Sequence, residues 1–236
     1  MLKTTFTLIW KKQLTHDVYE LIYSCPDLAK ESPKPGQYVM FQLAPGLNRS
    51  YSLASFTIDS FTLVIKRVME GKGSSIICDA LIGQIFSGML PLGHFVLRDT
   101  AVSKCFIGTG TWFAPLYCQM LACADRIGLS LDIGGWGDFS PRATFVFWVR
   151  NLVDSFYSSE IAKLWEQISD FRYIPYLSRE QQPGFSHGYV IDWITPENIA
   201  EYSEFYLCGS PIMVKSAREK LEAFGVTKEA IFWEQF

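Results

Sequence analysis

The sequence predicts two domains: a small antiparallel β-barrel over residues 1–100, and an α/β domain with a parallel sheet over residues 101–236. Three observations predict this division. Residues 1–100 contain short strand-like segments between Pro- and Gly-rich turns, a pattern typical of a small barrel. After residue 103, apolar strand-like segments alternate with helix-like segments, which indicates a parallel sheet covered by helices. The length of 236 residues is sufficient for two hydrophobic cores.

The elements of each half follow from periodicity and turn residues. In the first half, one helix is expected over residues 74–81, and the strands are expected over residues 5–10, 18–24, 37–43, 49–54, 61–67, 88–90 and 94–97. In the second half, helices are expected over residues 114–126, 158–167, 197–202 and 212–224. The strands of that half are expected over residues 105–107, 144–149, 171–177, 205–208 and 230–233.

Composition and charge exclude several classes of protein. The net charge of −3 argues against a dedicated nucleic-acid binder, which usually carries a strongly basic face. No apolar run reaches 18 residues, and the first residues lack the apolar core of a signal peptide, so a cytoplasmic protein that does not span a membrane is expected. The six cysteines form no Cys-x-x-Cys pair and are expected to be thiols. The three histidines are not at metal-ligand spacing, so no metal site is expected.

The segment Arg49-Ser50-Tyr51-Ser52 is the first candidate for a functional site. Arg supplies a cation of fork geometry that suits a pyrophosphate. Tyr supplies an aromatic surface for a flat ring, and a small Ser can form a hydrogen bond without blocking a reactive atom. Such a set suits a flavin, whereas the alternative interpretation is an ordinary strand with an arginine on its surface.

A glycine-containing loop follows in the same half. Lys66 and Arg67 precede the run from Glu70 to Ser75, in which Gly71, Gly73 and Ser74 open the predicted helix. Glycines allow the backbone to approach a phosphate, and a helix N-terminus offers N–H groups to it. By itself such a loop is a weak signal, and its position about twenty residues after Arg49 strengthens it.

In the second half, Gly108-Thr109-Gly110 follows a strand and precedes a helix, as dinucleotide-binding loops do. The spacing is not Gly-x-Gly-x-x-Gly, so this is not the common fingerprint. Three further motifs follow in order: Val149-Arg150, then Ser178-Arg179-Glu180, then Cys208-Gly209-x-Pro211-x-Met213.

The ordered set of motifs resembles the ferredoxin–NADP reductase family, from Pro35-Gly36-Gln37-Tyr38 to the terminal Glu234-Gln235-Phe236. The resemblance implies an FAD-binding barrel and an NAD(P)-binding domain, without a fused ferredoxin domain. It implies that Arg49 holds the FAD pyrophosphate, that Tyr51 stacks on the isoalloxazine ring, and that Ser52 lies near its N5 atom. Lys66, Gly73 and Ser74 would complete the FAD site. Phe236 would cover the other face of the flavin.

The resemblance also implies a nucleotide site in the second domain. Gly108, Thr109, Gly110 and Arg150 would bind the dinucleotide. Cys208 would lie beside the nicotinamide C4, although a buried core cysteine is an almost equal alternative. Glu234 would belong to a proton or hydrogen-bond relay beside the flavin. Ser178 and Arg179 match positions that bind the 2′-phosphate, so NADPH is expected in preference to NADH, with a solvated loop arginine as the alternative.

Two tryptophans depart from the family pattern, which would place glycine at Trp112 and at Trp148. Both positions end adjacent strands, where the pyrophosphate approaches the backbone and a Cβ would intrude. One hypothesis is that the two indoles fill the pyrophosphate site and weaken nucleotide binding. The other is that UGA codons read as Gly in the source are printed here as Trp, which UGG codons at both positions would exclude.

The function that the resemblance implies is an FAD-dependent oxidoreductase that moves electrons between NADP(H) and a separate carrier such as ferredoxin or flavodoxin. The carrier must be separate because the cysteines do not have the spacing of an iron–sulfur site. Two alternatives stay open. One is an FAD-binding electron-transfer subunit that docks on a partner and uses NAD(P)H poorly. The other is an NAD(P)H flavin reductase that releases reduced flavin.

Overall fold

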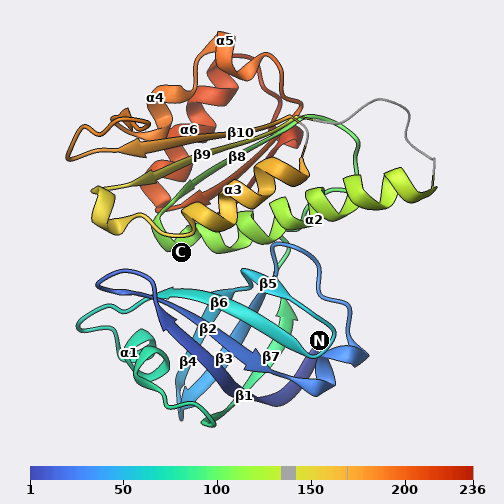
Figure 1. Cartoon of the computed structure of the whole chain (residues 1–236), viewed down its shortest axis with the longest axis vertical. Coiled ribbons are helices and arrows are strands. Elements are labelled where there is room, and N and C mark those ends of the chain that lie inside the picture. The colour runs from blue at the N-terminus through green and yellow to red at the C-terminus, as the bar shows by residue number, and fades with distance from the viewer. Residues whose placement is uncertain (134–141, 169, 236) are drawn as a thin grey trace. The chain divides into compact units, whose positions relative to one another are not determined.

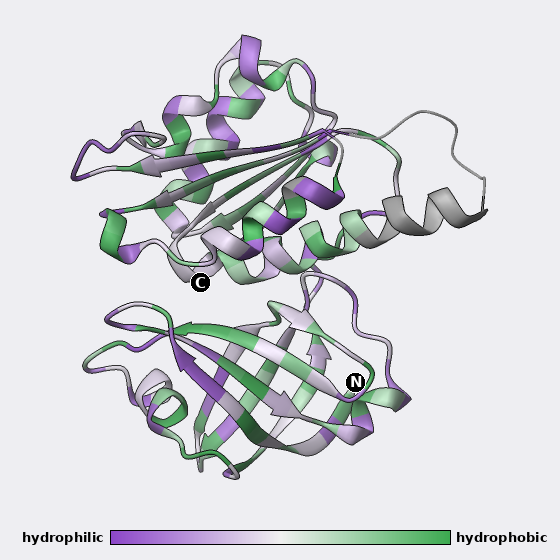
Figure 2. Ribbon diagram, viewed as in Figure 1, coloured by the Kyte–Doolittle hydropathy of each residue, from purple (hydrophilic) through white to green (hydrophobic). Residues whose placement is uncertain are grey.

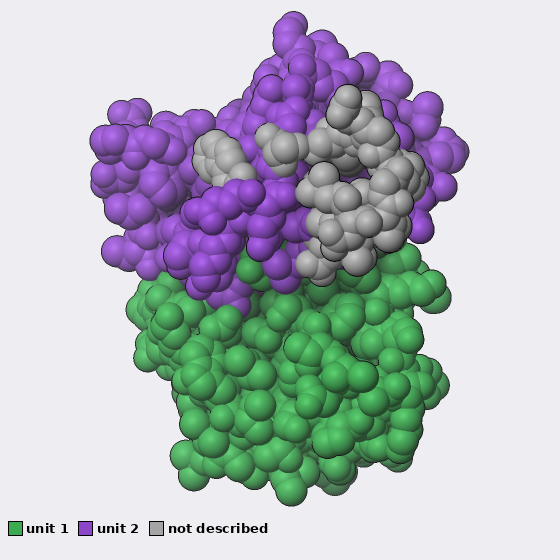
Figure 3. All heavy atoms as spheres, turned by 45° about the vertical axis from the view of Figure 1, so that its right-hand side comes forward, with its two compact units in different colours: residues 1–97, 117–119 green, residues 98–116, 120–236 purple. Residues whose placement is uncertain are grey.

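The computed structural model describes residues 1–133, 142–168 and 170–235, without the side chains of residues 125–133 and of Trp165. The chain divides into two compact units, coloured separately in Figure 3. Unit 1 comprises residues 1–97 with residues 117–119, and unit 2 comprises residues 98–116 and 120–236. The expected fold class is confirmed, because unit 1 contains a curled antiparallel sheet and unit 2 a parallel sheet with helices.

Unit 1 is built on a seven-stranded antiparallel sheet in the order β4-β3-β7-β1-β2-β6-β5 (Figure 1). Its strands are β1 Leu2–Gln13, β2 Val18–Ser24, β3 Tyr38–Ala44, β4 Leu47–Ser52, β5 Ser55–Phe56, β6 Ser60–Lys66 and β7 Ile85–Leu92. Its helices are the 3-10 helix η1 Pro26–Lys30 and the α-helix α1 Lys72–Asp79.

The core of unit 1 is strongly aromatic. Phe6, Tyr23, Phe41 and Phe61 are buried, and the ring centroids of Phe6 and of Tyr23 lie 4.7 to 5.6 Å from each other and from those of the other two. These residues come from four different strands, on which hydrophobic and hydrophilic residues are mixed (Figure 2). One face of the sheet therefore closes around the rings, as expected for half-buried strands.

The second unit has a six-stranded sheet in the order β11-β10-β9-β8-β12-β13, in which all neighbours are parallel. Its strands are β8 Lys104–Thr109, β9 Ala143–Val149, β10 Phe171–Leu177, β11 Ser186–His187, β12 Glu204–Gly209 and β13 Ile231–Gln235. Its α-helices are α2 Phe113–Ile133, α3 Ser158–Gln167, α4 Val190–Trp193, α5 Pro196–Ile199 and α6 Pro211–Ala223. Its 3-10 helices are η2 Gly110–Trp112, η3 Leu152–Asp154 and η4 Lys228–Ala230.

Helices cover both faces of this sheet (Figure 1). Residues of α4, α5 and α6 pack in one cluster with β8, β9 and β12. On the other face, Phe113 of α2 packs against Phe145 and Phe147 of β9. After β8, the next strands β9 and β10 are added on one side of β8. The later strand β12 lies on the opposite side of β8. The carboxyl ends of β8 and β12 therefore form the switch point at which open α/β sheets bind ligands.

One expected strand is longer in the structure, and another is absent. The strand expected over residues 88–90 is part of a longer strand, β7, which continues through the cis Leu90–Pro91 bond and ends at Leu92. Residues 94–97 do not form a strand, since Gly93 at φ +98° turns the chain. Leu97 instead donates one backbone hydrogen bond to the carbonyl of Pro35.

The six cysteines are thiols, as expected, and only Cys123 among them is partly exposed. None of the described helices is long and apolar enough to cross a membrane.

Candidate functional site

The structure brings Arg49, Tyr51 and Gly73 together in unit 1. Arg49 and Tyr51 lie on β4, and Gly73 lies in the first turn of α1. A Cβ atom on Gly73 would lie 2.5 Å from Arg49 Cγ and 3.1 Å from the Tyr51 hydroxyl oxygen. The absence of a Cβ on Gly73 therefore lets the start of α1 approach these two side chains closely, and a phosphate-binding role for this element stays a prediction.

The N-terminus of α1 provides donors for an anion. Its N-cap is Gly71, and among the described residues no side chain caps this end. The first turn contains Lys72 and no acidic residue. Uncapped N–H groups, the helix dipole and the neighbouring Arg49 together favour a negatively charged group. The Arg49 side chain is exposed, and one of its five donors is used by the carbonyl of Asn48 at 2.7 Å.

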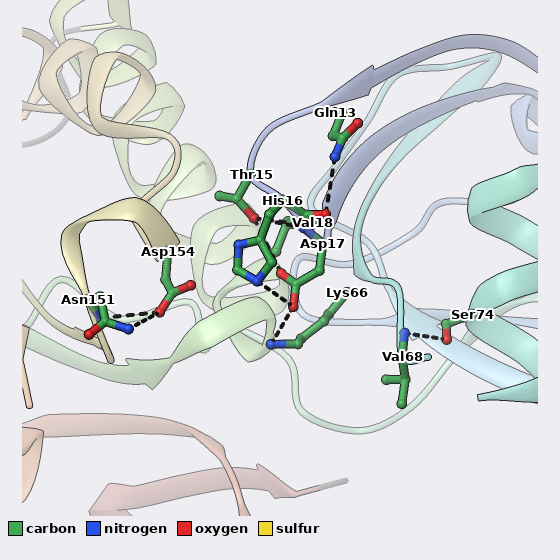
Figure 4. Close-up of polar contacts among 10 residues, drawn as sticks. All are labelled: Gln13, Thr15, His16, Asp17, Val18, Lys66, Val68, Ser74, Asn151 and Asp154. Carbon is green, nitrogen blue, oxygen red and sulfur yellow. Dashed lines mark hydrogen bonds and ion pairs between the residues drawn. The ribbon is translucent and has the colours of Figure 1, made fainter. Parts of the chain in front are cut away.

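Ser74 shapes the loop in front of α1 rather than presenting its hydroxyl outward. It is almost fully buried, and its Oγ accepts a hydrogen bond from the backbone N–H of Val68 at 3.0 Å (Figure 4). The N–H of Gly71 donates to the Val68 carbonyl at 3.0 Å. These bonds fix the loop from Val68 to Gly71, so Ser74 contributes to the predicted site through the backbone.

The side chain of Lys66 contacts residues other than those around Gly73. Its Nζ lies 2.8 Å from the carboxylate of Asp17, in the turn between β1 and β2 (Figure 4). The same carboxylate lies 3.3 Å from His16 Nε2. The structure thus places Lys66 with Asp17, and the predicted contact of Lys66 with a cofactor stays a prediction.

Tyr51 and Ser52 form the end of β4. Tyr51 is half-buried, and its ring meets Phe41 edge-on at 5.7 Å. Burial, chiefly, raises the pKa of Tyr51 to about 12, so its hydroxyl stays protonated and can donate a hydrogen bond. Ser52 is almost fully buried and pairs with Tyr38 of β3.

In unit 2, the predicted glycine turn lies at the switch point of the sheet. Gly110 has φ +54°, and a Cβ there would meet no atom within 4 Å among the described residues other than its chain neighbours. Gly108 has a packing role, since a Cβ there would lie 2.7 Å from Leu116 Cδ1 of α2. Thr109 is buried, and its Oγ1 would lie 2.8 Å from a Cβ on Gly209 of β12. The motifs around Gly108 and around Cys208 are therefore adjacent.

Cys208 and Glu234 are partners on neighbouring strands. They are paired in the register of β12 and β13, and Cys208 is fully buried. Burial raises the pKa of Glu234 to about 7, and Glu234 Oε2 is buried without a hydrogen-bond partner among the described residues. Burial and then the charge of Glu234 raise the pKa of Cys208, so this thiol stays protonated. Phe236, the predicted flavin cover, lies outside the described residues.

The loops after β9 and β10 bring Arg150, Ser178 and Arg179 together. The N–H of Arg179 donates to the carbonyl of Arg150 at 3.0 Å, and both arginines are exposed. The carboxylate of Glu180 accepts a hydrogen bond from the N–H of Leu152, which ties the two loops together. Asn151 and Asp154 further fix the first loop through a bond of 3.2 Å (Figure 4). Two guanidinium groups on tied loops suit a phosphate.

Met213, which belongs to the predicted motif that begins at Cys208, lies on α6 against Gly209, where a Cβ would collide with its Cε. Two other residues at these sites were missed by the sequence. Tyr189 is 57% exposed, and its ring lies 5.7 Å from that of Trp148. Lys11 donates to the carbonyls of Cys78 and Ala80 at the end of α1. Tyr189 and Lys11 are distant from every motif, so no spacing could have indicated them.

Comparisons with known proteins agree with this fold. Residues 106–219 match the oxidoreductase NAD-binding domain family. The fold of the chain is similar to that of the cytochrome P450 reductase GcoB from Amycolatopsis, at a TM-score of 0.84 and 23% identity, over 100% of this chain and 70% of that one. It is also similar to a ferredoxin NADP+ reductase from Neisseria gonorrhoeae with bound FAD and NADP, at a TM-score of 0.79 and 19% identity, over 99% and 98% of the two chains. The chain therefore has the two-domain fold of these reductases.

Among curated relatives, the reductase component of propane 2-monooxygenase from Mycolicibacterium goodii is 31% identical over 235 residues, which cover 94% of this chain and 64% of that protein. The chain thus spans less than two thirds of the length of this and two similar curated relatives. The resemblance stated from the motifs is confirmed. The roles of single residues, and the codon hypothesis for Trp112 and Trp148, stay predictions.

Proposed function

We propose that this chain is an FAD-dependent oxidoreductase that moves electrons between NADP(H) and a separate one-electron carrier such as ferredoxin or flavodoxin. Its relatives support the coarser statement that it is an oxidoreductase of the reductase type. The observation that carries the proposal is the arrangement around Gly73, where the side chains of Arg49 and Tyr51 lie next to the uncapped N-terminus of α1. A cation beside free backbone N–H groups suits the pyrophosphate of a dinucleotide cofactor.

The residues of unit 1 fit FAD. Arg49 and the N–H groups of the first turn of α1 would hold the pyrophosphate, and Tyr51 would pack against the isoalloxazine ring. Ser52, at the end of the same strand, would lie near N5. When bound, the flavin accepts two electrons as a hydride and passes them on singly, which is the chemistry that a carrier requires.

The residues of unit 2 fit a nicotinamide dinucleotide. Thr109 and Gly110 would receive the pyrophosphate at the switch point. Cys208 and Glu234 would lie at the nicotinamide end, where a carboxyl with a pKa of about 7 can either donate or accept a hydrogen bond. Arg150, Ser178 and Arg179 would bind the 2′-phosphate, which is the reason to prefer NADPH over NADH.

The test of this function uses the purified chain loaded with FAD. We expect a flavin absorbance spectrum that stays with the protein on gel filtration, and bleaching of that absorbance by NADPH in a stopped-flow instrument. An Arg179→Ala variant should lose most of its affinity for NADPH and little of its affinity for NADH. FAD retention without any bleaching by either nucleotide would contradict the proposed use of nucleotides.

A second function has a specific observation in its favour. Trp148 puts an indole on the strand end next to Thr109, where a dinucleotide would bind. An FAD-binding electron-transfer subunit that uses NAD(P)H poorly would be compatible with this residue. Calorimetry that finds tight FAD binding and no nucleotide binding would favour the subunit over the reductase.

A further inference from the structure

Trp148 lies at the carboxyl end of β9, the strand next to the switch point of the sheet in unit 2. It is the penultimate residue of β9 and pairs with Thr109, the last residue of β8. Its indole packs against the buried cluster that contains Val146 of the same strand and residues of α4 and α6. The indole therefore occupies volume on the same face as Thr109, beside the turn at Gly110.

The other flank of Thr109 is also filled. On β12, a Cβ at Gly209 would lie 2.8 Å from Thr109 Oγ1, and Met213 of α6 closes over the same position. On the β9 side, Trp148 lies tilted against Tyr189, with ring centroids 5.7 Å apart. Thr109 is thus enclosed between a methionine and an indole, and the indole is the larger of the two side chains.

The indole of Trp148 is held in this space by apolar contacts and not by a hydrogen bond from its Nε1 atom to any described residue. Trp148 Nε1 is buried and has no hydrogen-bond partner in the described part of the chain. A buried indole N–H normally finds an acceptor, because an unpaired donor is costly. The contacts of Trp148 are therefore apolar, and a smaller apolar side chain would satisfy them while leaving room at the strand end.

We propose that Trp148 restricts the size of the dinucleotide site and lowers the affinity of unit 2 for a nicotinamide dinucleotide. This inference rests on the proposed function, in which Thr109 and Gly110 receive the pyrophosphate. Shortening residue 148 would open the strand end on the β9 side, where the phosphate approaches the backbone. The loss of the indole N–H by itself would have little effect on binding.

The experiment compares three forms of the FAD-loaded full chain: wild type, Trp148→Gly and Trp148→Phe. Titration calorimetry with NADPH and with NADH measures the dissociation constants. We expect Trp148→Gly to bind at least tenfold more tightly than wild type, and Trp148→Phe to stay within about threefold of wild type. A Trp148→Gly variant that binds no more tightly would overturn the inference. A Trp148→Phe variant that binds tenfold more weakly would also overturn it, because the N–H would then be a ligand donor.

Two further variants keep the test independent of folding. Trp148→Val replaces the indole by a smaller side chain that favours strands, and should show the same direction of change if Trp148→Gly does not fold. Trp233→Phe changes an exposed tryptophan on β13 and should leave nucleotide affinity unaltered.

The outcomes separate this inference from the proposed function. Tight binding by wild type with no gain in Trp148→Gly refutes the role of Trp148 and leaves the proposed function standing. Retained FAD with no nucleotide binding in any variant refutes the use of nucleotides, and the inference with it.

Discussion

At the scale of single residues, Glu234 shows how a neighbouring strand sets the chemistry of a side chain. Its carboxyl is largely buried beside the thiol of Cys208, and burial raises its pKa to about 7. Near neutral pH this carboxyl therefore keeps its proton far more readily than an exposed glutamate, in a fold that also keeps the Cys208 thiol protonated. A carboxyl in this state can exchange a proton with a ligand without a large cost in free energy.

This shift predicts a pH-dependent stability. The folded pKa of Glu234 lies above its unfolded value of about 4.5, so the folded state retains the proton longer. Its contribution is undisturbed below about pH 4.5, and the free energy of unfolding falls as the pH rises from there to above 7, by up to about 3 kcal/mol for a shift of this size. Glu234→Gln removes this dependence.

The measurement is urea unfolding of wild type and Glu234→Gln at pH 5 and at pH 8. The difference in stability between the two proteins should change with pH in favour of the variant at pH 8. If the free energies of unfolding of the two proteins changed in parallel with pH, the pKa of Glu234 would not be raised in the folded state.

Single residues differ in how well the sequence predicted them. Arg49, Tyr51 and Gly73 come together as expected, because the motif spacing and the strand–helix order already fix their neighbourhood. The ion pair of Lys66 with Asp17 depends on the conformation of the turn between β1 and β2, which no motif describes. Trp148 contacts Tyr189, forty-one residues later in the chain, and no motif indicates this contact or the burial of Trp148 Nε1.

At the scale of elements, α1 is a helix of eight residues that needs its neighbours to be stable. Lys11 of β1 donates to the carbonyls of Cys78 and Ala80 at its end, at 3.1 and 2.8 Å. Arg67 makes two bonds of 2.8 Å with the Asp79 carboxylate. These contacts hold the helix whose first turn contains Gly73, so the end of α1 influences the site at its beginning.

We therefore expect Lys11→Met to weaken FAD binding and to destabilise unit 1. The variant leaves two carbonyls without their donor, at a cost of about 1 to 2 kcal/mol. The melting temperature should fall by roughly 2–8 °C. Lys12→Met, at the exposed neighbouring position, is the matched control. Equal melting temperatures and FAD affinities in the two variants would show that Lys11 does not hold α1.

Most elements were predicted in place because their apolar periodicity is clear, and β2 was predicted with both of its ends. The failures have local causes. The four-residue helix α4 is too short for a periodic signal, and the two-residue strands β5 and β11 depend on their partners. The continuation of β7 through Pro91 was missed because proline is usually read as the end of a strand.

At the scale of the whole molecule, a buried polar network ties the segment that enters unit 2 to its central strands. Lys104 and Glu204 are both buried, with Lys104 Nζ 3.5 Å from Glu204 Oε2. Thr100 and Tyr206 donate to the same carboxylate at 2.7 and 2.8 Å. The ammonium group also donates to the carbonyls of Thr100 and Val102. A network with these partners satisfied fixes one arrangement of the segment.

Glu204→Gln should destabilise unit 2 by about 3 kcal/mol, because it leaves the buried Lys104 without its counter-charge. Glu201→Gln is the control, since Glu201 is 51% exposed where it pairs with Arg142 and Arg172, and its loss should cost less than about 1 kcal/mol. Chemical denaturation of both variants measures the difference. Equal decreases in the free energy of unfolding would show that the pair of Lys104 and Glu204 does not stabilise unit 2 more than the ion pairs of Glu201 do.

The fold class as a whole could be predicted because two patterns, strand-rich before residue 100 and alternating after it, occupy separate stretches of the chain. The polar network could not be predicted from the sequence. Its four side chains lie in two segments far apart in the chain, and each alone resembles an ordinary surface residue: Thr100, Lys104, Glu204 and Tyr206. Its burial is a property of the assembled sheet.

The distribution of the thiols allows the protein to be labelled at a single position. Five cysteines are buried, and burial raises the pKa of Cys25, Cys78, Cys105, Cys118 and Cys208. Only Cys123 is partly accessible, so a maleimide dye should label the native protein at one position. A fluorophore attached there without any engineering would report on α2, the helix whose residues are shared between the two units.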